Sequence, residues 1–376
     1  MIKVQQELVL KGTSRDFEIF KNDLEEDESL ALKFLYAYMP LSDLANYNAD
    51  FFLKQVKYSL KARNEMPWGK NIPEDEFLHF VLPIRVNNEN LDTFRIVYYN
   101  ELKERVQNMS MYDAALEVNH WCHEKVTYRA SDSRTSSPLN TIKYSYGRCG
   151  EESVLTVAAM RMVGIPARQV YTPRWAHSDD NHAWVEVWID GKWYFLGACE
   201  PDPELNMGWF AFPASRTMLV HTRAFGKYFG GEEQIVSEDR FSELNLISNY
   251  AEANQITVVV KDDNNNYVEN ADVSFRLYNY AEFFPIATKK TDVNGQASIS
   301  LGLGDILVWI NKDNLFNFKH VRVAESDTII ISLERTHIYP YQIDLDFVPP
   351  SGKFVEDYCG EKTDIINKRL MYEDSV

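Results

Sequence analysis

The sequence is poor in cysteine, in positive charge and in long apolar runs. Four cysteines (Cys122, Cys149, Cys199 and Cys359) among 376 residues are too few to indicate a disulfide framework. Acidic residues outnumber basic ones by 56 to 39, and the net charge of -17 argues against a nucleic-acid partner, whose phosphates would be repelled. No segment approaches the roughly 18 consecutive apolar residues that a membrane-spanning helix requires.

Motifs for metals, cofactors and export are lacking as well. Cys122-His123 and His177 do not have the paired spacing of a zinc site, and no glycine-rich phosphate loop occurs. We therefore expect no metal and no cofactor. The first residues, Met-Ile-Lys-Val-Gln-Gln-Glu-Leu, contain no apolar signal core, so either the protein is cytoplasmic or an export signal has been removed.

Helical patterns fill the first part of the chain. Apolar residues recur at helical spacing through residues 14–66. The polar segment 131–140 predicts a loop. Between them, three further helices are predicted over Glu74–Val81, Asn90–Val106 and Tyr112–His123.

After residue 167 the apolar period changes from helical spacing to two. This alternation predicts strands over Arg168–Thr172, His182–Ile189 and Lys192–Leu196. Asp190-Gly191 is a favoured hairpin turn between the last two. Helices followed by antiparallel strands are typical of an α+β domain.

The last part of the chain predicts a β-sandwich. Asn- and Gly-rich turns separate short alternating runs at Ile256–Lys261, Ala271–Tyr278, Gln296–Leu301, Asp305–Asn311 and Thr328–Leu333. The protein is therefore predicted to be multidomain. Its expected parts are an N-terminal helical region (1–75), an α+β catalytic domain (76–245), a β-sandwich domain (255–335) and a C-terminal extension (336–376).

The run Tyr-Gly-Arg-Cys-Gly-Glu-Glu-Ser at 146–153 holds the strongest candidate for chemistry. Its glycines permit a tight turn and its two glutamates suit the first turn of a helix, so Cys149 should lie at the helix start. Unpaired N–H groups and the helix dipole there favour a thiolate and can bind an oxyanion. An inert buried cysteine is the ordinary alternative, but such a turn is a poor place to bury one.

The run Asn-His-Ala-Trp-Val-Glu-Val-Trp at 181–188 supplies a base. It places His182 at the start of a predicted strand, from which an imidazole can reach a nucleophile on a neighbouring element. A histidine at a strand end is unremarkable by itself. Together with Cys149 it provides the thiol and the proton acceptor of a nucleophilic pair.

Four blocks between residues 140 and 203 carry a resemblance. Gly-Arg-Cys-Gly-Glu, Gly-Ile-Pro-Ala-Arg, His-Ala-Trp-Val-Glu-Val and Gly-Lys-Trp-Tyr-Phe, in this order, resemble the transglutaminase-like superfamily, which includes the peptide N-glycanases. Such proteins are similar to papain in mechanism. The resemblance implies that Cys149 attacks a carboxamide and that His182 acts as general base and acid.

The third member of the implied catalytic triad departs from the family pattern. The family's aspartate usually falls four residues after the second-strand tryptophan, and counting from Trp193 gives Gly197. We expect Glu200 to orient the histidine in its place, with Asp202 as the second choice. The third residue is the most replaceable of the triad.

Other residues of the site are less determined by the sequence. Tyr146 and Trp184 are expected to contact the substrate, and Arg148 and Arg168 to brace the site through ion pairs with Glu151 or Glu186. A second oxyanion donor is expected from upstream side chains, with Trp68, Asn87, Asn88 and Trp121 as the candidates.

The β-sandwich sequence around residues 258–297 resembles carboxypeptidase-regulatory-like or related Ig-like modules. These modules are common on bacterial surface and periplasmic proteins. The resemblance implies a spacer or a binding module in contact with carbohydrate or the cell envelope. It favours an extracytoplasmic location, in the periplasm or at the cell surface with the signal removed, over a cytoplasmic one.

The predicted function is hydrolysis of a peptide or carboxamide bond in a protein or peptide substrate, through a Cys–His acyl-enzyme. Hydrolysis is favoured because water is always available, whereas a transferase must exclude it. The alternatives are a protein-glutamine transglutaminase and an N-glycanase-like amidase. A non-catalytic binding module with a degenerate triad is a further alternative, supported by Gly197.

Overall fold

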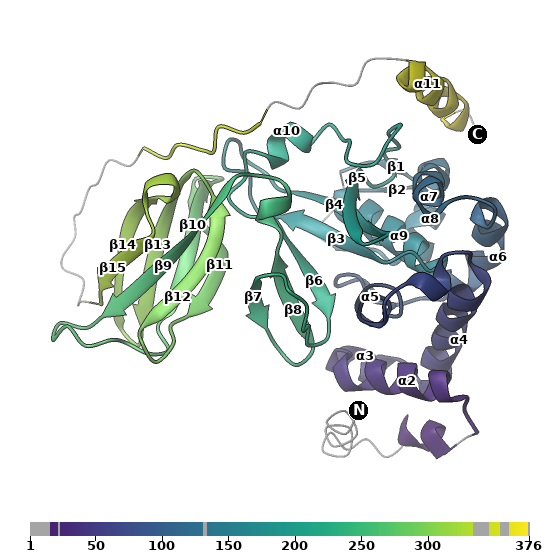
Figure 1. The fold of residues 1–376 in the computed structure, drawn as a ribbon, viewed down its shortest axis with the longest axis horizontal. Helices are drawn as coiled ribbons and strands as arrows, with labels where there is room; N and C mark the ends of the chain where they lie inside the picture. Colours follow the sequence, from purple (N-terminus) through teal and green to yellow (C-terminus); the bar gives the residue numbers. More distant parts are fainter. Residues whose placement is uncertain (1–15, 22, 131–133, 334–345, 354–360, 375–376) are drawn as a thin grey trace.

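The structure is a computed structural model that describes residues 16–21, 23–130, 134–333, 346–353 and 361–374. Helices pack around a six-stranded antiparallel sheet, and a two-sheet sandwich follows beside it (Figure 1). The predicted combination of N-terminal helices, an α+β core and an all-β sandwich is therefore confirmed.

The helices precede most of the strands in the chain. The ones predicted between 74 and 130 are present as α5, α6 and α7, while the end of the predicted loop 131–140 joins α8, with Pro138 at its first position. No helix among the described residues has the length and apolar content that crossing a membrane requires. The bounds are α2 (Glu26–Tyr38), α3 (Leu41–Asn46), α4 (Ala49–Glu65), α5 (Glu74–Phe80), α6 (Phe94–Val106), α7 (Met111–Lys125), α8 (Pro138–Tyr144), α9 (Cys149–Met162), α10 (Ala211–Ala214) and α11 (Glu361–Glu373).

Helix α9 lies at the centre of the core. It contacts α4, α6, α7 and α8 on one side and two strands of the sheet on the other, and nearly all its side chains are buried. Its apolar side chains thus face neighbours on several sides, as expected of a helix in the interior of a domain. Leu32, Phe52 and Val56 of the expected N-terminal region belong to the same apolar core as Leu155 and Met160 of α9, so residue 75 marks no break in packing.

The six-stranded sheet has the order β5-β4-β3-β6-β8-β7. The predicted hairpin between β4 and β5 is present, with Asp190 and Gly191 at positive φ angles of 49° and 93°. Strands β6, β7 and β8 were not predicted. The bounds are β3 (Ala167–Thr172), β4 (His182–Ile189), β5 (Lys192–Leu196), β6 (His221–Phe225), β7 (Gln234–Ser237) and β8 (Phe241–Asn245).

The sandwich consists of a four-stranded sheet, β11-β10-β13-β14, and a three-stranded sheet, β12-β9-β15. Its five predicted strands are present, and β11 and β14 are additional. The sequence did not reveal β14 because its side chains are half-buried or exposed almost throughout. The bounds are β9 (Ala253–Lys261), β10 (Asp272–Asn279), β11 (Glu282–Lys290), β12 (Gln296–Gly302), β13 (Asp305–Lys312), β14 (Leu315–Arg322) and β15 (Thr328–Ser332).

The sandwich is bonded to the loop that precedes His182. The side-chain amide of Asn279 donates hydrogen bonds to the carbonyl oxygens of Trp175 (3.0 Å) and Ser178 (2.9 Å). The Tyr280 N–H donates to the carboxylate of Asp179 over 2.7 Å. The tip of the β10–β11 hairpin therefore holds the 173–181 loop in place.

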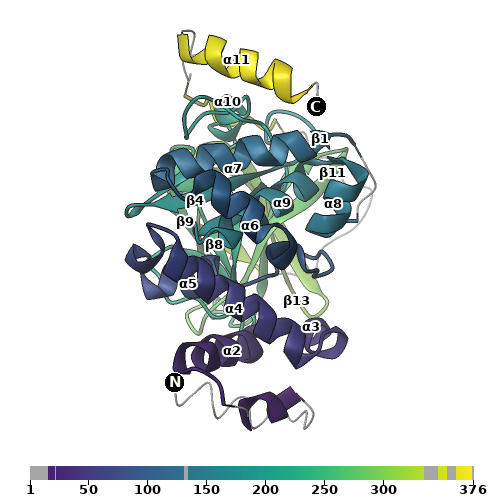
Figure 2. The same cartoon turned by 90° about the vertical axis from the view of Figure 1, so that its right-hand side faces the viewer.

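The described end of the chain returns to the core. Helix α11 lies near α7, at the opposite end of the molecule from α2 (Figure 2). Arg369 of α11 pairs with Glu117 of α7 at 2.8 Å. Within the expected C-terminal extension, 336–345 and 354–360, which include Cys359, lie outside the described residues.

Candidate active site

Cys149 is the first residue of α9, as the sequence predicts. The preceding turn is fixed by the Glu151 carboxylate, which accepts from the Arg148 backbone N–H over 2.8 Å. A Cβ on Gly147 would lie 2.9 Å from the Cβ of Glu151, and one on Gly150 would lie 2.6 Å from Nη1 of Arg148. Gly147 is thus required by the close packing of the turn that presents the thiol, whereas a Cβ at Gly150 would need only the end of the Arg148 side chain to move.

His182 is the first residue of β4 and is paired with Thr172 of β3. Its imidazole lies within a cluster of aromatic rings, and its Nε2 is buried without a hydrogen-bond partner among the described residues. Aromatic packing therefore fixes the position of the ring. The distances between ring centroids are 4.8 Å to Trp209, 5.1 Å to Phe210, 5.7 Å to Trp184 and 6.2 Å to Trp175.

Burial sets the protonation of both residues. It lowers the pKa of His182 to about 4, against the opposing effect of the Asp180 carboxylate. It also raises the pKa of the Cys149 thiol, although hydrogen bonds from the Ala183 and Gly150 N–H groups and the charge of Arg148 act in the other direction. The helix start was expected to favour a thiolate, and this is wrong for the resting protein because desolvation outweighs it. Thiol and imidazole are both neutral.

Cys149 and His182 line the same cavity, of about 840 Å³. A smaller cavity of about 340 Å³ also reaches Cys149 but not His182. Both volumes lie in the range of roughly 300–1,000 Å³ that is usual for ligand sites. The thiol thus stands where two substrate-sized spaces meet, with the imidazole on the side of the larger one.

Glu200 lines the larger cavity but does not bond directly to His182. Its Oε2 accepts from the indole Nε1 of Trp209 over 3.0 Å, and the Trp209 ring is the nearest aromatic neighbour of His182. Burial raises the pKa of both Glu200 and Asp202. Among the described residues, neither carboxylate therefore bonds directly to the imidazole as expected. The Trp209 indole lies between Glu200 and His182.

Of the four candidates for a second oxyanion donor, two lie beside Cys149 and two are bonded elsewhere. The indole of Trp68 donates to the carbonyl of Val163 (3.0 Å) and that of Trp121 to Glu101 (2.8 Å), so both are engaged elsewhere. Asn87 and Asn88 line the smaller cavity beside Cys149. The Asn87 amide donates to Gln169 over 2.6 Å.

Neither of the two expected substrate contacts, Trp184 and Tyr146, lines either cavity at Cys149. Trp184 is 0% exposed and its indole donates to the Tyr250 hydroxyl, so it packs beneath His182 and cannot touch a substrate from there. Tyr146 lies against Arg129. Across the pairing of β1 (Thr127–Tyr128) with β2 (Tyr146–Gly147), Tyr146 faces Thr127, and it is the next residue, Tyr128, that lines the larger cavity.

Sequence reasoning missed Tyr128, Trp209 and Asp180 as cavity residues. Asp180 carried one usable signal, since it stands two residues before His182 in a polar run. Its φ of 96° is an uncommon backbone state for a residue other than glycine, and such strain tends to occur at functional sites. Trp209 had no such signal, because it is distant in sequence from both catalytic candidates.

The expected arginine bracing is present. Arg168 is fully buried and pairs with Glu186 at 2.6 Å, with its guanidinium 3.8 Å from the centre of the Trp193 ring. Arg148 pairs with Glu151 at 3.8 Å. These pairs tie β3 to β4 and the turn to α9, which holds the two catalytic candidates in register.

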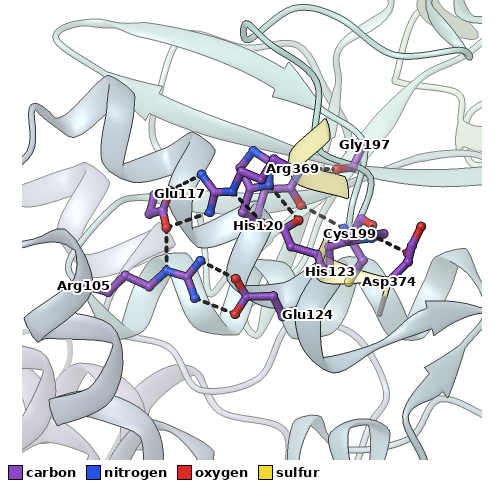
Figure 3. Close-up of polar contacts among 11 residues, drawn as sticks. Arg105, Glu117, His120, His123, Glu124, Gly197, Cys199, Arg369 and Asp374 are labelled. Atoms are coloured by element: carbon purple, nitrogen blue, oxygen red, sulfur yellow. Dashed lines mark hydrogen bonds and ion pairs between the residues drawn. The ribbon is translucent and has the colours of Figure 1, made fainter. Parts of the chain in front are cut away.

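The loop that carries Glu200 is anchored from behind by α7. The Asn119 amide donates to the Gly197 carbonyl (2.8 Å) and accepts from the Cys199 N–H (2.9 Å), and His123 Nδ1 lies 3.0 Å from the Cys199 carbonyl. Figure 3 shows Asp374, the residue directly after α11, reaching His123 on the same face. Helix α7 thus bonds both to the Glu200 loop and to the segment that contains α11.

Cys122, Cys149 and Cys199 are free thiols. Within the described ranges, no group of three or more His, Cys, Asp or Glu side chains converges as a set of metal ligands.

A half-buried thiol at a helix start, an imidazole on the neighbouring strand and a shared cavity define a thiol-enzyme type of site. Residues 100–198 match the transglutaminase-like superfamily, and residues 240–302 match the bacterial Ig-like domain (group 1). The chain thus combines a transglutaminase-like core with an Ig-like domain. A search of curated proteins gave no match.

Several solved structures show a distant likeness. A Cytophaga hutchinsonii protein designated a cysteine protease is 18% identical, with 48% of this chain and 66% of that chain covered and a TM-score of 0.29. Legionella pneumophila LapG is 15% identical over 40% of this chain and 80% of its own, with a TM-score of 0.24. Red sea bream transglutaminase is 8% identical over 72% and 58%, with a TM-score of 0.26. Likeness at this level carries no conclusion about function.

Proposed function

We propose that this protein is a thiol hydrolase that cleaves a peptide or carboxamide bond in a protein or peptide substrate. Cys149 attacks the carbonyl carbon and His182 takes the thiol proton, then delivers it to the leaving amine. Water hydrolyses the resulting thioester. The observation that carries the proposal is that Cys149, at the start of α9, and His182, at the start of β4, line one cavity.

The neutral resting state defines what His182 must do. Because burial raises the pKa of Cys149 and lowers that of His182, the thiol keeps its proton until a substrate is bound. Proton transfer then accompanies attack, which is general base catalysis and contributes typically about 10²–10⁴-fold to a rate. The Ala183 and Gly150 N–H groups, which lower the thiol pKa by hydrogen bonding, are suited to stabilise the negative charge that develops there.

The exposed larger cavity favours hydrolysis over transfer. Trp209 at its edge is 63% exposed and Tyr128 is 59% exposed, so water has access to the thioester. A protein-glutamine transglutaminase would use the same intermediate with an amine in place of water. An N-glycanase-like amidase would use it on a glycosylated asparagine. The glycine at 197 supports a further alternative, a binding module without catalysis.

A peptide-library digest tests the proposal. The full chain is incubated with a mixed-sequence peptide pool and the products are identified by mass spectrometry, in water enriched in oxygen-18 and with an added fluorescent amine. Hydrolysis incorporates oxygen-18 into the new carboxyl group, whereas transfer incorporates the amine. Cys149→Ala and His182→Ala should each lower turnover by about 10³-fold or more.

Cys122→Ala is the matched control. Cys122 is a buried free thiol in α7 that lines neither cavity, so this variant should keep turnover near the wild-type value. Turnover that survives in Cys149→Ala, or that never appears in the wild-type protein, contradicts the hydrolase proposal.

A further inference from the structure

The two cavities that meet at Cys149 differ in the charged side chains that line them. We propose that the larger cavity binds a cationic group, such as a lysine or arginine side chain or a free amine, on the leaving-group side of the cleaved bond. The choice of the leaving-group side rests on the proposed function. The preference of the cavity for a cation does not.

The residues around each cavity carry the charge difference. The larger cavity is lined by three acids, Glu152, Asp180 and Glu200, and by aromatic rings whose faces attract cations. The residues that line the smaller cavity, within the described chain, include no carboxylate. They include several side-chain amides, Arg223, which pairs with Glu243, and His221, whose pKa is lowered by burial.

Arg148 lines both cavities, but its charged end lies on the side of the smaller one. Nη1 lies 2.6 Å from the position of a Cβ on Gly150, and Nη2 lies 3.4 Å from the hydroxyl of Thr135. Gly150 and Thr135 line only the smaller cavity. This guanidinium therefore lies on the side of the smaller cavity, where it pairs with Glu151.

Glu152 is the residue that points to a ligand. It is 2% exposed and lines the larger cavity, yet its carboxyl group forms no hydrogen bond or ion pair with another described residue. A buried carboxylate without a partner is costly, so an empty cavity keeps this group protonated. Burial, reinforced by the charges of Glu200, Glu151 and Cys122, raises the pKa of Glu152 to about 9.

A cation that enters the cavity replaces this proton. The positive charge stabilises the ionised form of Glu152, which then becomes the buried partner of the cation, and the proton leaves to solvent. Binding is therefore coupled to proton release at neutral pH. The groups that face Glu152 across the cavity and act on the same equilibrium are Glu200, Asp180, His182, Cys149, Tyr128 and Arg148.

The position of His182 indicates that the larger cavity holds the leaving amine of the substrate. The imidazole must give its proton to the leaving nitrogen, and it lines the larger cavity but not the smaller one. The acyl part of the substrate then occupies the smaller cavity, and the cationic amine part faces Glu152. An incoming water or amine takes the path of the departing group.

Charged thiol reagents test the cation preference without any turnover. Full-length protein is treated with the cationic 2-(trimethylammonium)ethyl methanethiosulfonate and, separately, with the anionic 2-sulfonatoethyl methanethiosulfonate. Mass spectrometry of proteolytic fragments follows modification at Cys149. The ratio of the two rate constants, divided by the ratio for free 2-mercaptoethanol, cancels the thiolate fraction and reports only the charge of the cavity.

We expect this ratio to exceed one and to rise through pH 9 as Glu152 ionises, to about tenfold in favour of the cation at low salt. Glu152→Gln should abolish the rise. Glu76→Gln is the matched control, because burial also raises the pKa of Glu76, to about 7, and it lines neither cavity. This variant should behave as wild type.

The outcomes separate the two proposals. A ratio near or below one that does not change with pH overturns the cation site, whatever turnover is found, and this holds for the wild-type protein even if Glu152→Gln fails to fold. Products of the peptide digest without a basic residue on the amine side contradict the assignment of this cavity to the leaving-group side. Absence of Cys149-dependent turnover together with a ratio that rises in the wild type contradicts only the hydrolase proposal.

Discussion

The carboxylate oxygen Oε2 of Glu200 lies 2.8 Å from the point that a Cβ atom on Gly197 would occupy. The two residues are joined by a backbone bridge, so the chain folds Glu200 back over the glycine. A Cβ at 197 would force the Glu200 side chain to shift, because the Glu200 Cβ also lies only 3.0 Å from that point. The glycine that interrupts the expected triad is therefore a condition for the position of Glu200.

A side chain at 197 should be tolerated when the Glu200 side chain is removed, and should destabilise the protein when Glu200 is kept. Gly197→Ala is expected to destabilise the protein by about 1–3 kcal/mol, because the new Cβ meets the Glu200 side chain. Gly197→Asp combined with Glu200→Ala removes that clash and restores the family pattern, so turnover should equal or exceed that of Gly197→Ala. Denaturant unfolding and peptide turnover measure the two effects. Equal stability of Gly197→Ala and wild type would contradict the overlap.

The Trp209 indole should position His182 through its ring more than through its N–H group. Trp209→Phe keeps a ring beside the imidazole and loses only the bond to Glu200, so turnover should fall a few-fold. Trp209→Ala opens the aromatic cluster and should lower turnover by about 10². The latter variant should also raise the pKa of His182 from about 4, as water reaches the ring. NMR titration of the histidine reports this shift, and an unmoved pKa counts against the ring's role.

The resting protein should lack a thiolate–imidazolium pair. Alkylation of Cys149 by iodoacetamide should increase with pH through a midpoint above the ordinary thiol pKa of about 8.5, because burial raises the pKa. The His182 ring is neutral above about pH 4 and charges below it. Since an unfolded histidine titrates near about 6.5, the stability that the neutral ring contributes should be lost as pH falls from there toward 4. An alkylation midpoint below pH 7 would show a stabilised thiolate instead.

The sandwich should support catalysis through Asn279. Asn279→Ala leaves the Trp175 and Ser178 carbonyls without their donor, at a cost of about 1–3 kcal/mol, and loosens the loop before His182. Turnover should fall about tenfold. Asn317→Ala removes a comparable bond, to the Ser332 carbonyl, wholly inside the sandwich and serves as the control. An equal loss of turnover in both variants would indicate a general effect of sandwich stability.

Local signals were sufficient for the elements that carry the site. Glycines and glutamates around residue 149 predicted the start of α9, and period-two alternation predicted β4 from its first residue, His182. Strands β6 to β8, β11 and β14 were not predicted, since their apolar and polar residues alternate weakly. Strands β7 and β14 pair with their neighbours in the chain, whereas β6 pairs with β3 across the whole of β4 and β5. The register of such strands depends on contacts that a local pattern does not encode.

The sequence by itself determined which residues are proposed as the reactive pair, because the helix start and the strand start are both consequences of short-range preferences. Only the tertiary structure decided their environment. The cluster of rings around His182, the indole between it and Glu200, and the burial that keeps Cys149 protonated all come from residues far apart in the chain. Desolvation and charge depend on what surrounds a group in space, and the order of residues along the chain does not specify that.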